Sequence, residues 1–276
     1  MKKALAVFTA VICFGIGSPA LAQLTAAEQA EYEKWEDFLR TAKVAASEQL
    51  PKSEGVTQPY ELTLEKDGVT RKALWKNALG ERVGGYKETW KGEIAAYRLS
   101  RHLGLHMVPA TVEREFQGDR GSCQIWVDAP LNMETMLKKK LSPPGIKNMH
   151  FHRAIHIQRA FDNLISNEDR HQRNYLITDD WRMVLIDHSR SFRTTKKFTT
   201  RLIYDEKNKE NKTFIMASMP RSFYDALKAL TAETIRTVVG EYLTDEEIAA
   251  TLARRDLMIA WLDNYIAKEG ETKVLY

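Results

Sequence analysis

Residues 167–192 read NEDRHQRNYLITDDWRMVLIDHSRSF, and this stretch decides which fold the sequence predicts. Two acidic residues, Asp169 and Asp187, lie on either side of Asn174. Between Asn174 and Asp187, two short apolar runs are separated by residues 179–182, a pattern that predicts a β-hairpin with a four-residue loop. Pairing the strands back from that loop places Asn174 opposite Asp187.

The predicted hairpin would allow Asn174 and Asp187 to bind the same metal ion. Directly opposed residues have Cβ atoms about 4.5–5.5 Å apart, so the Asn174 amide oxygen and the Asp187 carboxylate can reach one hard cation, Mg²⁺ or Mn²⁺. Asp169 precedes Asn174 by five residues, the spacing of the protein-kinase catalytic loop, where the Asp accepts a hydroxyl proton and the Asn holds metal. Taken singly, each residue more often caps a turn or a helix end. Their order and the hairpin between them favour catalysis.

A lysine and a glutamate upstream complete this set. A strand-like run, residues 71–76, ends in Lys76, and Glu93 lies in the first turn of the helix that follows. Alternation places Lys76 on the same face of the strand as Leu74. In kinases a strand lysine paired with a helix glutamate holds the α- and β-phosphates of the nucleotide. We therefore predict that Lys76 and Glu93 form such a pair.

The remaining pattern predicts an α+β protein in which a small antiparallel sheet is followed by a mostly helical half. Asp67-Gly68 signals a tight turn between two strand-like runs. A glycine-rich loop, residues 80–85, leads into the helix that carries Glu93. The expected strands are 60–65, 71–76, 111–116 and 122–127, and the expected helices are 25–46, 89–102, 150–167, 220–230, 232–242 and 245–267.

The N-terminus has the pattern of a cleavable export signal. Lys2 and Lys3 precede an uncharged apolar run, residues 4–17, and Ala20-Leu21-Ala22 has the small-x-small pattern of a signal peptidase site. The apolar run is shorter than the roughly 20 residues that span a bilayer. We expect cleavage after Ala22, a periplasmic or secreted protein, and no stable membrane anchor after cleavage. An uncleaved N-terminal anchor is the alternative.

The composition predicts a folded chain and argues against nucleic acid as a partner. The 276 residues are 43% hydrophobic, which allows a sizeable core in one large domain or two lobes. Lys and Arg total 41 against 37 Asp and Glu, and no basic block is interleaved with aromatic residues. Signal cleavage would leave Cys123 as the only cysteine, so no internal disulfide can form. We expect Cys123 to be a small buried hydrophobe.

Three segments resemble a known group of enzymes. DNLISNEDRH at 162–171 and LIDHSRSF at 185–192 resemble the atypical kinases related to HipA, to the phosphatidylinositol 3-/4-kinases and to the secretory-pathway casein kinases. KGEIAAYRLSRHLGL at 91–105 resembles the helix in the N-terminal lobe of these kinases. The resemblance covers residues from about 48 to 192.

The resemblance implies a bilobal kinase-like fold that binds ATP, with Mg²⁺ or Mn²⁺, between its lobes. It implies a phosphate loop at residues 53–57 and an adenine site bordered by residues 124–127. The implied roles are Asp169 as catalytic base; Asn174 and Asp187 as metal ligands; Lys76, Glu93, Ser53, Gly55 and Thr57 around the phosphates; and Gln124 and Val127 beside the base.

Two departures from ordinary protein kinases stand out. No G-x-G-x-x-G precedes Lys76, and Gly55 is the only glycine of the implied phosphate loop. His188 and Ser189 follow Asp187 where ordinary kinases have Phe-Gly. The second departure fits the atypical kinases better than the ordinary ones.

The leading prediction is an exported, ATP-dependent phosphotransferase that moves the γ-phosphate to a hydroxyl of a protein, lipid or small molecule. The first alternative is a pseudokinase, which keeps the fold for nucleotide binding or scaffolding, since ATP is scarce outside the cytoplasm. The second is transfer of another part of the nucleotide to a protein. The predicted organisation is a signal peptide at 1–22, an N-terminal helix at 23–47, an N-lobe at 48–128 and a C-lobe at 129–276.

Overall fold

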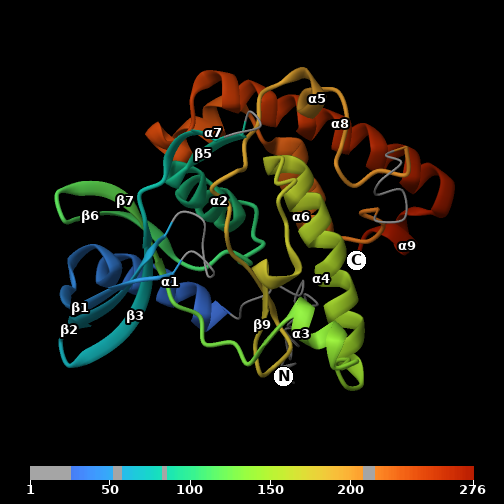
Figure 1. The fold of residues 1–276 in the computed structure, drawn as a ribbon. Coiled ribbons are helices and arrows are strands. Elements are labelled where there is room, and N and C mark those ends of the chain that lie inside the picture. The colour runs from blue at the N-terminus through green and yellow to red at the C-terminus, as the bar shows by residue number, and fades with distance from the viewer. Residues whose placement is uncertain (1–25, 52–57, 83–85, 208–214) are drawn as a thin grey trace, which may run out of the picture.

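The structure, a computed structural model, describes residues 26–51, 58–82, 86–207 and 215–276. Most strands and the helix of residues 26–41 lie on one side of the molecule and most other helices on the other, with the helix of residues 90–102 between them (Figure 1). This α+β, two-part arrangement is the one the sequence predicts. The implied signal peptide, residues 1–22, lies outside the described residues.

A five-stranded antiparallel sheet forms the first part. Its strand order is β1-β2-β3-β7-β6, so the last two strands enter beside β3 and leave β1 at one edge and β6 at the other. The strands are β1 (Lys43–Gln49), β2 (Tyr60–Lys66), β3 (Val69–Lys76), β6 (Thr111–Phe116) and β7 (Asp119–Ile125).

The turn between β2 and β3 confirms the Asp-Gly prediction. Lys66 pairs with Val69, which leaves Asp67 and Gly68 as a two-residue loop. Both have positive φ, 52° and 75°, as a type I′ turn requires. The turn fixes the register of β3, and therefore the face on which Lys76 lies.

The first helix is shorter than expected. Helix α1 (Ala26–Thr41) ends at Thr41, and Lys43–Gln49 forms the edge strand β1 rather than two more helical turns. The expectation of a helix reaching residue 46 is therefore wrong. This segment is rich in Ala, Glu and Gln, which favour helix locally, but pairing with β2 provides backbone hydrogen bonds that override the local preference. Phe38 and Leu39 of α1 are buried against the sheet.

Helix α2 (Trp90–His102) follows a short hairpin. Thr89 caps its first turn by accepting a hydrogen bond from the backbone N–H of Lys91. The residues before it form strands β4 (Leu79–Arg82) and β5 (Tyr86–Thr89). The expected glycine-rich loop at 80–85 is therefore strand up to Arg82, and residues 83–85 lie outside the described residues.

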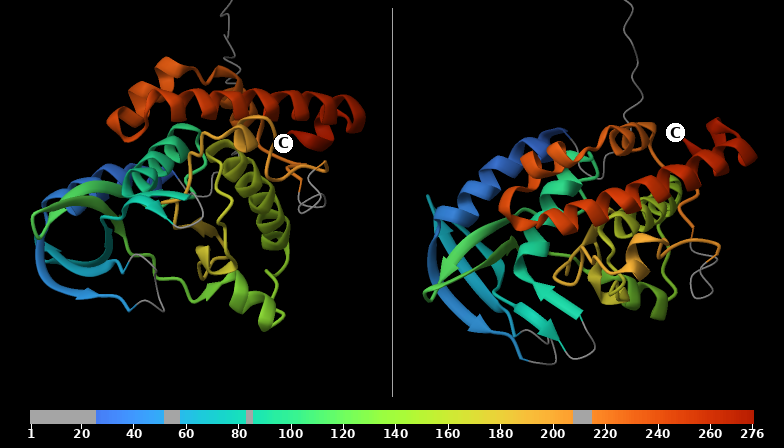
Figure 2. Two further views of the ribbon diagram at one scale, coloured as in Figure 1. Left: turned by 45° about the horizontal axis from the view of Figure 1, so that its top comes forward. Right: turned by 90° about the horizontal axis from the view of Figure 1, so that it is seen from above.

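The second part is mostly helical, as predicted. Helix α4 (Ile146–Ile165) begins four residues earlier than expected and is capped at its C-terminal end by Ser166, whose φ of 56° is left-handed. Helix α8 (Asp245–Glu269) begins with a capping box between Thr244 and Glu247 and lies across the helical part (Figure 2). The other helices are α3 (Met133–Lys138), α5 (Lys196–Thr199), α6 (Arg221–Ala229), α7 (Ala232–Val239) and α9 (Glu271–Val274).

A second, three-stranded sheet lies at the junction of the two parts. Strands β9 (Tyr175–Ile177) and β10 (Met183–Leu185) form the hairpin that the sequence predicts, and β8 (Leu131–Asn132), which was not expected, pairs with β9. Cys123 is buried, and its burial raises the pKa of the thiol to about 12. In the described part of the chain, no helix combines the length and apolar character needed to cross a membrane.

Candidate active site

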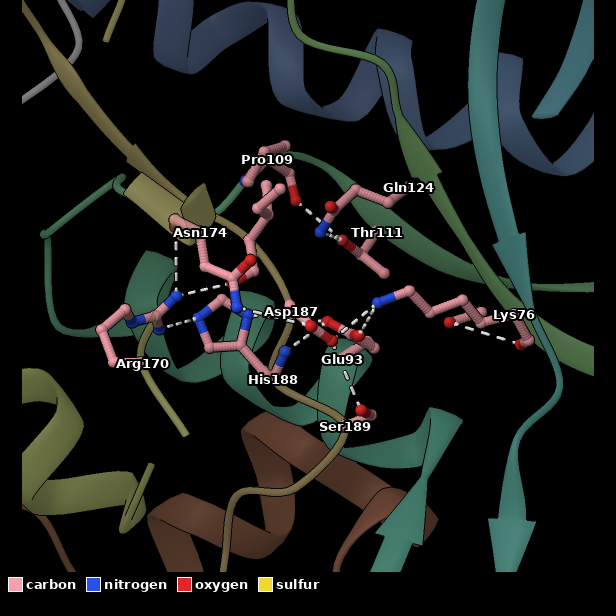
Figure 3. Close-up of polar contacts among 12 residues, drawn as sticks. Lys76, Glu93, Pro109, Thr111, Gln124, Arg170, Asn174, Asp187, His188 and Ser189 are labelled. Atoms are coloured by element: carbon pink, nitrogen blue, oxygen red, sulfur yellow. Dashed lines mark hydrogen bonds and ion pairs between the residues drawn. The ribbon is translucent and has the colours of Figure 1, made fainter. Parts of the chain in front are cut away.

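Lys76 lies at the end of β3 and points at two carboxylates (Figure 3). Its Nζ is 2.7 Å from Glu93 Oε1 and 2.9 Å from Asp187 Oδ1. Along β3, Ala73 and Trp75 are buried in the core, while Leu74 and Lys76 lie on the opposite face. The predicted strand alternation therefore directs Lys76 away from the core, and the predicted contact with Glu93 is present.

Glu93 is held in the first turn of α2 with only 2% of its surface exposed. Its second oxygen, Oε2, accepts a hydrogen bond of 2.9 Å from the backbone N–H of His188. Glu93 therefore joins the strand lysine to the segment that follows β10. Burial alone would raise the pKa of Glu93, but the Lys76 ammonium and the His188 contacts outweigh burial and lower it.

The charges of the cluster are mutually stabilised. Burial alone would lower the pKa of Lys76, yet the Asp187 and Glu93 carboxylates raise it above its ordinary value. The Lys76 ammonium lowers the pKa of Asp187. One cation thus keeps both carboxylates ionised at neutral pH.

The hairpin brings Asn174 to Asp187 by a different route from the one predicted. Met183 pairs with Ile177, so the ladder is shifted by one residue and Asn174 lies opposite Ile186, whose N–H donates to the Asn174 carbonyl at 3.2 Å. The predicted register is therefore wrong, because the loop has five residues rather than four. Asp187 adopts a left-handed φ of 64° just beyond β10, and its carboxylate oxygen Oδ2 lies 3.4 Å from the Asn174 amide nitrogen.

Asn174 and Asp187 together can hold part of a metal site. Among the described residues no group of three or more His, Cys, Asp or Glu side chains could hold a metal ion. Mg²⁺ commonly takes only one or two protein carboxylates and completes its octahedron with waters and substrate phosphates. Asp187 Oδ2 and the neighbouring Asn174 amide would fit that kind of site, the amide supplying its oxygen as a ligand in place of the present contact through its nitrogen.

Asp169 lies in the loop after α4, and both of its oxygens are engaged. Oδ2 is 2.9 Å from Arg190 Nη1, and Oδ1 is 2.9 Å from His171 Nε2. Arg190 also lies 3.7 Å from Glu88, and Ser189 bridges Glu88 and Asp187. Asp169 is therefore connected to the Lys76 cluster through Arg190, Glu88 and Ser189 rather than in direct contact with it.

A cavity of about 530 Å³ lies between β3, β7 and the β9–β10 hairpin. Gln124 and Val127 line it, together with Leu74, Leu176 and Ile186. Leu74 is two residues before Lys76 and Ile186 directly precedes Asp187, so the cavity adjoins the charged cluster. The two residues expected to border the base therefore lie on one cavity next to the expected phosphate site.

Three of the expected site residues, Ser53, Gly55 and Thr57, lie outside the described residues. Residues 52–57 connect β1 and β2. Their role beside the phosphates stays a prediction.

Sequence reasoning missed a buried polar chain behind the cluster. Arg170 and Asp162 form an ion pair of 2.9 Å with both side chains fully buried. Arg170 Nη2 also lies 2.9 Å from Nε2 of the buried His188. An arginine can only donate, so Nε2 accepts and Nδ1 carries the proton, 3.5 Å from Glu93 Oε2. Burial lowers the pKa of His188, which keeps the imidazole neutral.

Two features of the sequence are related to this set of buried polar side chains, although they do not identify it. Arg170 follows Asp169 directly, and His188 stands where ordinary kinases have Phe. Neither residue has a spacing pattern of its own. Their contact depends on how α4, the Asp169 loop and β10 pack together.

Comparisons with known proteins agree on the fold. The sequence gave no match to any family model and no significant match to a curated protein. Among solved structures, hydra Fam20 with sugar superposes with a TM-score of 0.64 at 15% identity, covering 90% of this chain and 92% of that one. The Golgi casein kinase with Mn/ADP bound gives a TM-score of 0.62 at 14% identity, covering 89% of this chain and 78% of that one.

A second Golgi casein kinase structure gives a TM-score of 0.59 at 14% identity, covering 88% of this chain and 79% of that one. The chain therefore has the bilobal α+β fold of these atypical kinases, as the sequence predicted. At these identities the likeness concerns the fold, and the chemistry must be argued from the residues of this chain.

Proposed function

We propose that this chain is an exported phosphotransferase that moves the γ-phosphate of ATP to a hydroxyl group. One observation carries the proposal: Lys76 Nζ lies within 2.9 Å of both Glu93 and Asp187. An ammonium group held between two carboxylates and beside a cavity of this size is suited to bind nucleotide phosphates. The kinase-like fold supports the same conclusion.

The proposed division of labour follows from the contacts. Lys76, held by Glu93, would bind the α- and β-phosphates, and the cavity lined by Gln124 and Val127 would take the base. Asp169 would accept the proton of the acceptor hydroxyl as the oxygen attacks the γ-phosphorus. Arg190, which contacts Asp169, would hold the carboxylate in place until the acceptor binds.

Asn174 and Asp187 would hold Mg²⁺ or Mn²⁺. When bound, the metal would neutralise the charge of the nucleotide phosphates. The solved Golgi casein kinase contains Mn and ADP, which supports the proposal that this chain uses a nucleotide with such a metal. The Lys76 amine would meanwhile exchange its contact with Asp187 for contacts with the phosphates.

Export and the acceptor belong to the same proposal. The pattern at residues 1–22 supports cleavage after Ala22 and a periplasmic or secreted enzyme without a stable membrane anchor. The acceptor would be a hydroxyl of a protein, lipid or small molecule. We propose an N-lobe up to residue 128 and a C-lobe from residue 129.

The test is metal-dependent transfer by the full chain. We would measure ADP formation and γ-phosphate transfer from labelled ATP, with casein, water and the protein itself as acceptors, in Mg²⁺ or Mn²⁺. Asp169→Asn should keep nucleotide binding and lower transfer by roughly 10²–10⁴-fold, the usual contribution of a general base. Equal transfer by the two proteins would remove Asp169 from the mechanism.

A pseudokinase is the second candidate, and one observation favours it. Both oxygens of Asp169 are engaged, by Arg190 and His171, so an acceptor hydroxyl would have to compete with these contacts for the carboxylate. In that case calorimetry would detect ATP binding with Mn²⁺ while no ADP forms. A mass gain corresponding to AMP on a protein would instead indicate transfer of the other part of the nucleotide.

A further inference from the structure

The amide of Gln124 is fixed in one orientation by a short relay of hydrogen bonds. The Thr111 hydroxyl donates to the Pro109 carbonyl at 2.8 Å, and a carbonyl oxygen can only accept. The same hydroxyl is 2.8 Å from Gln124 Nε2 and must therefore accept from the amide NH₂. Figure 3 shows the three residues close together, joined by dashed lines that meet at the Thr111 hydroxyl. The relay leaves Gln124 Oε1 on the opposite side of the amide.

The free end of this amide belongs to the cavity. Gln124 is in β7, where it pairs with Leu74 of β3 on one side and Thr111 of β6 on the other. Gln124 and Leu74 both line the 530 Å³ cavity. Within the described ranges no donor contacts Oε1, and Oε1 is not among the enclosed, unpaired polar atoms. It is therefore open to the cavity as an acceptor.

We propose that Gln124 selects a purine with an exocyclic amine at position 6, that is adenine, over purines with a carbonyl there. The proposal rests on the proposed function, because it concerns the base of the nucleotide. A fixed carbonyl oxygen matches the N–H of a 6-amine and repels the oxygen of guanine or hypoxanthine. Gln124 is 7% exposed, so a mismatched group would lose a hydrogen bond where little water can replace it.

The relay of hydrogen bonds is the reason that Gln124 would favour a 6-amino purine over a 6-carbonyl purine. An unrestrained glutamine can turn its amide by half a turn and present either NH₂ or C=O, and it would then accept both kinds of purine. Here the turned amide would face the Thr111 hydroxyl with a carbonyl oxygen, while that hydroxyl is already donating to Pro109. Thr111 is therefore a positioning residue that acts through Gln124.

The test compares ATP with ITP, whose base carries a carbonyl in place of the 6-amine. We would measure the dissociation constant of each nucleotide with Mn²⁺ by calorimetry on the full chain. The wild type should bind ATP roughly ten- to a hundred-fold more tightly than ITP, as expected for one mismatched buried polar group. Gln124→Met, which keeps the length of the side chain but removes the acceptor, should bring the ratio to within about three-fold.

Two further variants separate the relay from packing. Thr111→Val keeps the shape but releases the amide, so it should bind ITP more tightly than the wild type does. Thr111→Ser keeps the hydroxyl and should keep the wild-type ratio. A merely structural role for Thr111 would weaken both nucleotides equally.

The outcomes distinguish this inference from the proposed function. Equal affinities of the wild type for ATP and ITP, or an unchanged ratio in Gln124→Met and Thr111→Val, would overturn the base selection alone. Binding of neither nucleotide by the wild type would overturn the proposed function and the base selection with it. Arg236→Met on α7, which removes an exposed surface pair with Asp245, should leave the ratio unchanged and serves as the control.

Discussion

Lys76 is the residue on which the charged cluster depends, because one ammonium group serves two carboxylates. Glu93 is nearly fully buried, and its low pKa stabilises the folded protein above its ordinary pKa of 4.5. That contribution is lost as pH falls through the lower pKa of the folded state. Without Lys76, burial and the neighbouring Asp187 would raise the pKa of Glu93 instead, and the sign of the pH dependence would reverse.

Lys76→Met should therefore cost more stability at pH 7 than at pH 4. We expect the difference in free energy of unfolding from the wild type to widen by about 1–3 kcal/mol over this range, equivalent to one or two pKa units. Urea unfolding at pH 4, 5, 6 and 7 measures it. Lys72→Met, at an exposed surface pair, should show no widening. A constant difference for Lys76→Met would mean that Glu93 is not held ionised by Lys76.

His188 connects the buried Arg170 to Glu93. Its ring accepts from Arg170, and its backbone N–H donates to Glu93. His188→Leu should leave Arg170 Nη2 without its acceptor and lower the free energy of unfolding by about 1–3 kcal/mol. His188→Gln, whose amide oxygen can accept from Arg170, should recover part of that loss in urea unfolding. Equal losses in the two variants would show that packing of the ring, not its hydrogen bond, matters.

Helix α2 positions Glu93 because a glycine lets the helix approach the segment after β10. A Cβ added at Gly92 would lie 2.8 Å from the His188 carbonyl oxygen, a backbone atom that cannot move aside cheaply. The hydrogen bond of 2.8 Å from Thr89 N–H to the Ser189 carbonyl holds the same approach. The backbone of residues 187–190 and the start of α2 therefore form one unit.

Gly92→Ala tests this unit, because the substitution has two effects of opposite sign on the stability of the folded protein. Alanine is the better helix former by about 0.8–1 kcal/mol, so helix propensity alone predicts a more stable protein. The close approach predicts that α2 is pushed away and that Glu93 no longer reaches Lys76. We expect a lower melting temperature and weaker ATP binding by calorimetry. A stabilised variant with unchanged ATP affinity would show that the contact has no role.

Prediction from the sequence succeeded where local signals decide structure. The Asp67-Gly68 turn and the helix expected at residues 89–102 depend on residues close in the chain, and both are present. β1 was mistaken for helix because only its pairing with β2 makes it a strand. The β9–β10 register was shifted by one because Thr178 belongs to the loop, where its N–H and hydroxyl bond to Arg182, and no motif signals this.

The candidate site also contains residues that the sequence predicts and contacts that it does not. Lys76, Glu93, Asn174 and Asp187 were predicted from order and spacing, and the structure brings them together. The contact of Arg190 with Asp169 was not predicted, because it depends on how the segment after Asp187 folds back. Tertiary packing, rather than any residue pattern, determines such contacts.

In the whole molecule, contacts to residues 187–190 join the sheet-containing and helical parts. Lys76 and α2 hold Asp187 and His188 from one side, while Arg190 contacts Asp169 of the helical part. A nucleotide bound between the parts would stabilise both at once. With Mn²⁺ and ATP at 100 times the dissociation constant, we expect about 2.7 kcal/mol of added stability. A single, higher melting transition would be the signature; two transitions of which only one shifts would contradict joint binding.

The central claim is that Lys76, Glu93, Asn174 and Asp187 form one nucleotide and metal site, and calorimetry with ATP and Mn²⁺ tests it most directly. The wild type and Asp169→Asn should bind ATP with similar affinity, because the role proposed for Asp169 concerns the acceptor and not the nucleotide. Asp187→Asn should bind ATP at least ten-fold more weakly and lose its dependence on Mn²⁺, since the carboxylate proposed to hold the metal is removed. ATP binding by Asp187→Asn that is as tight and as metal-dependent as in the wild type would contradict the account.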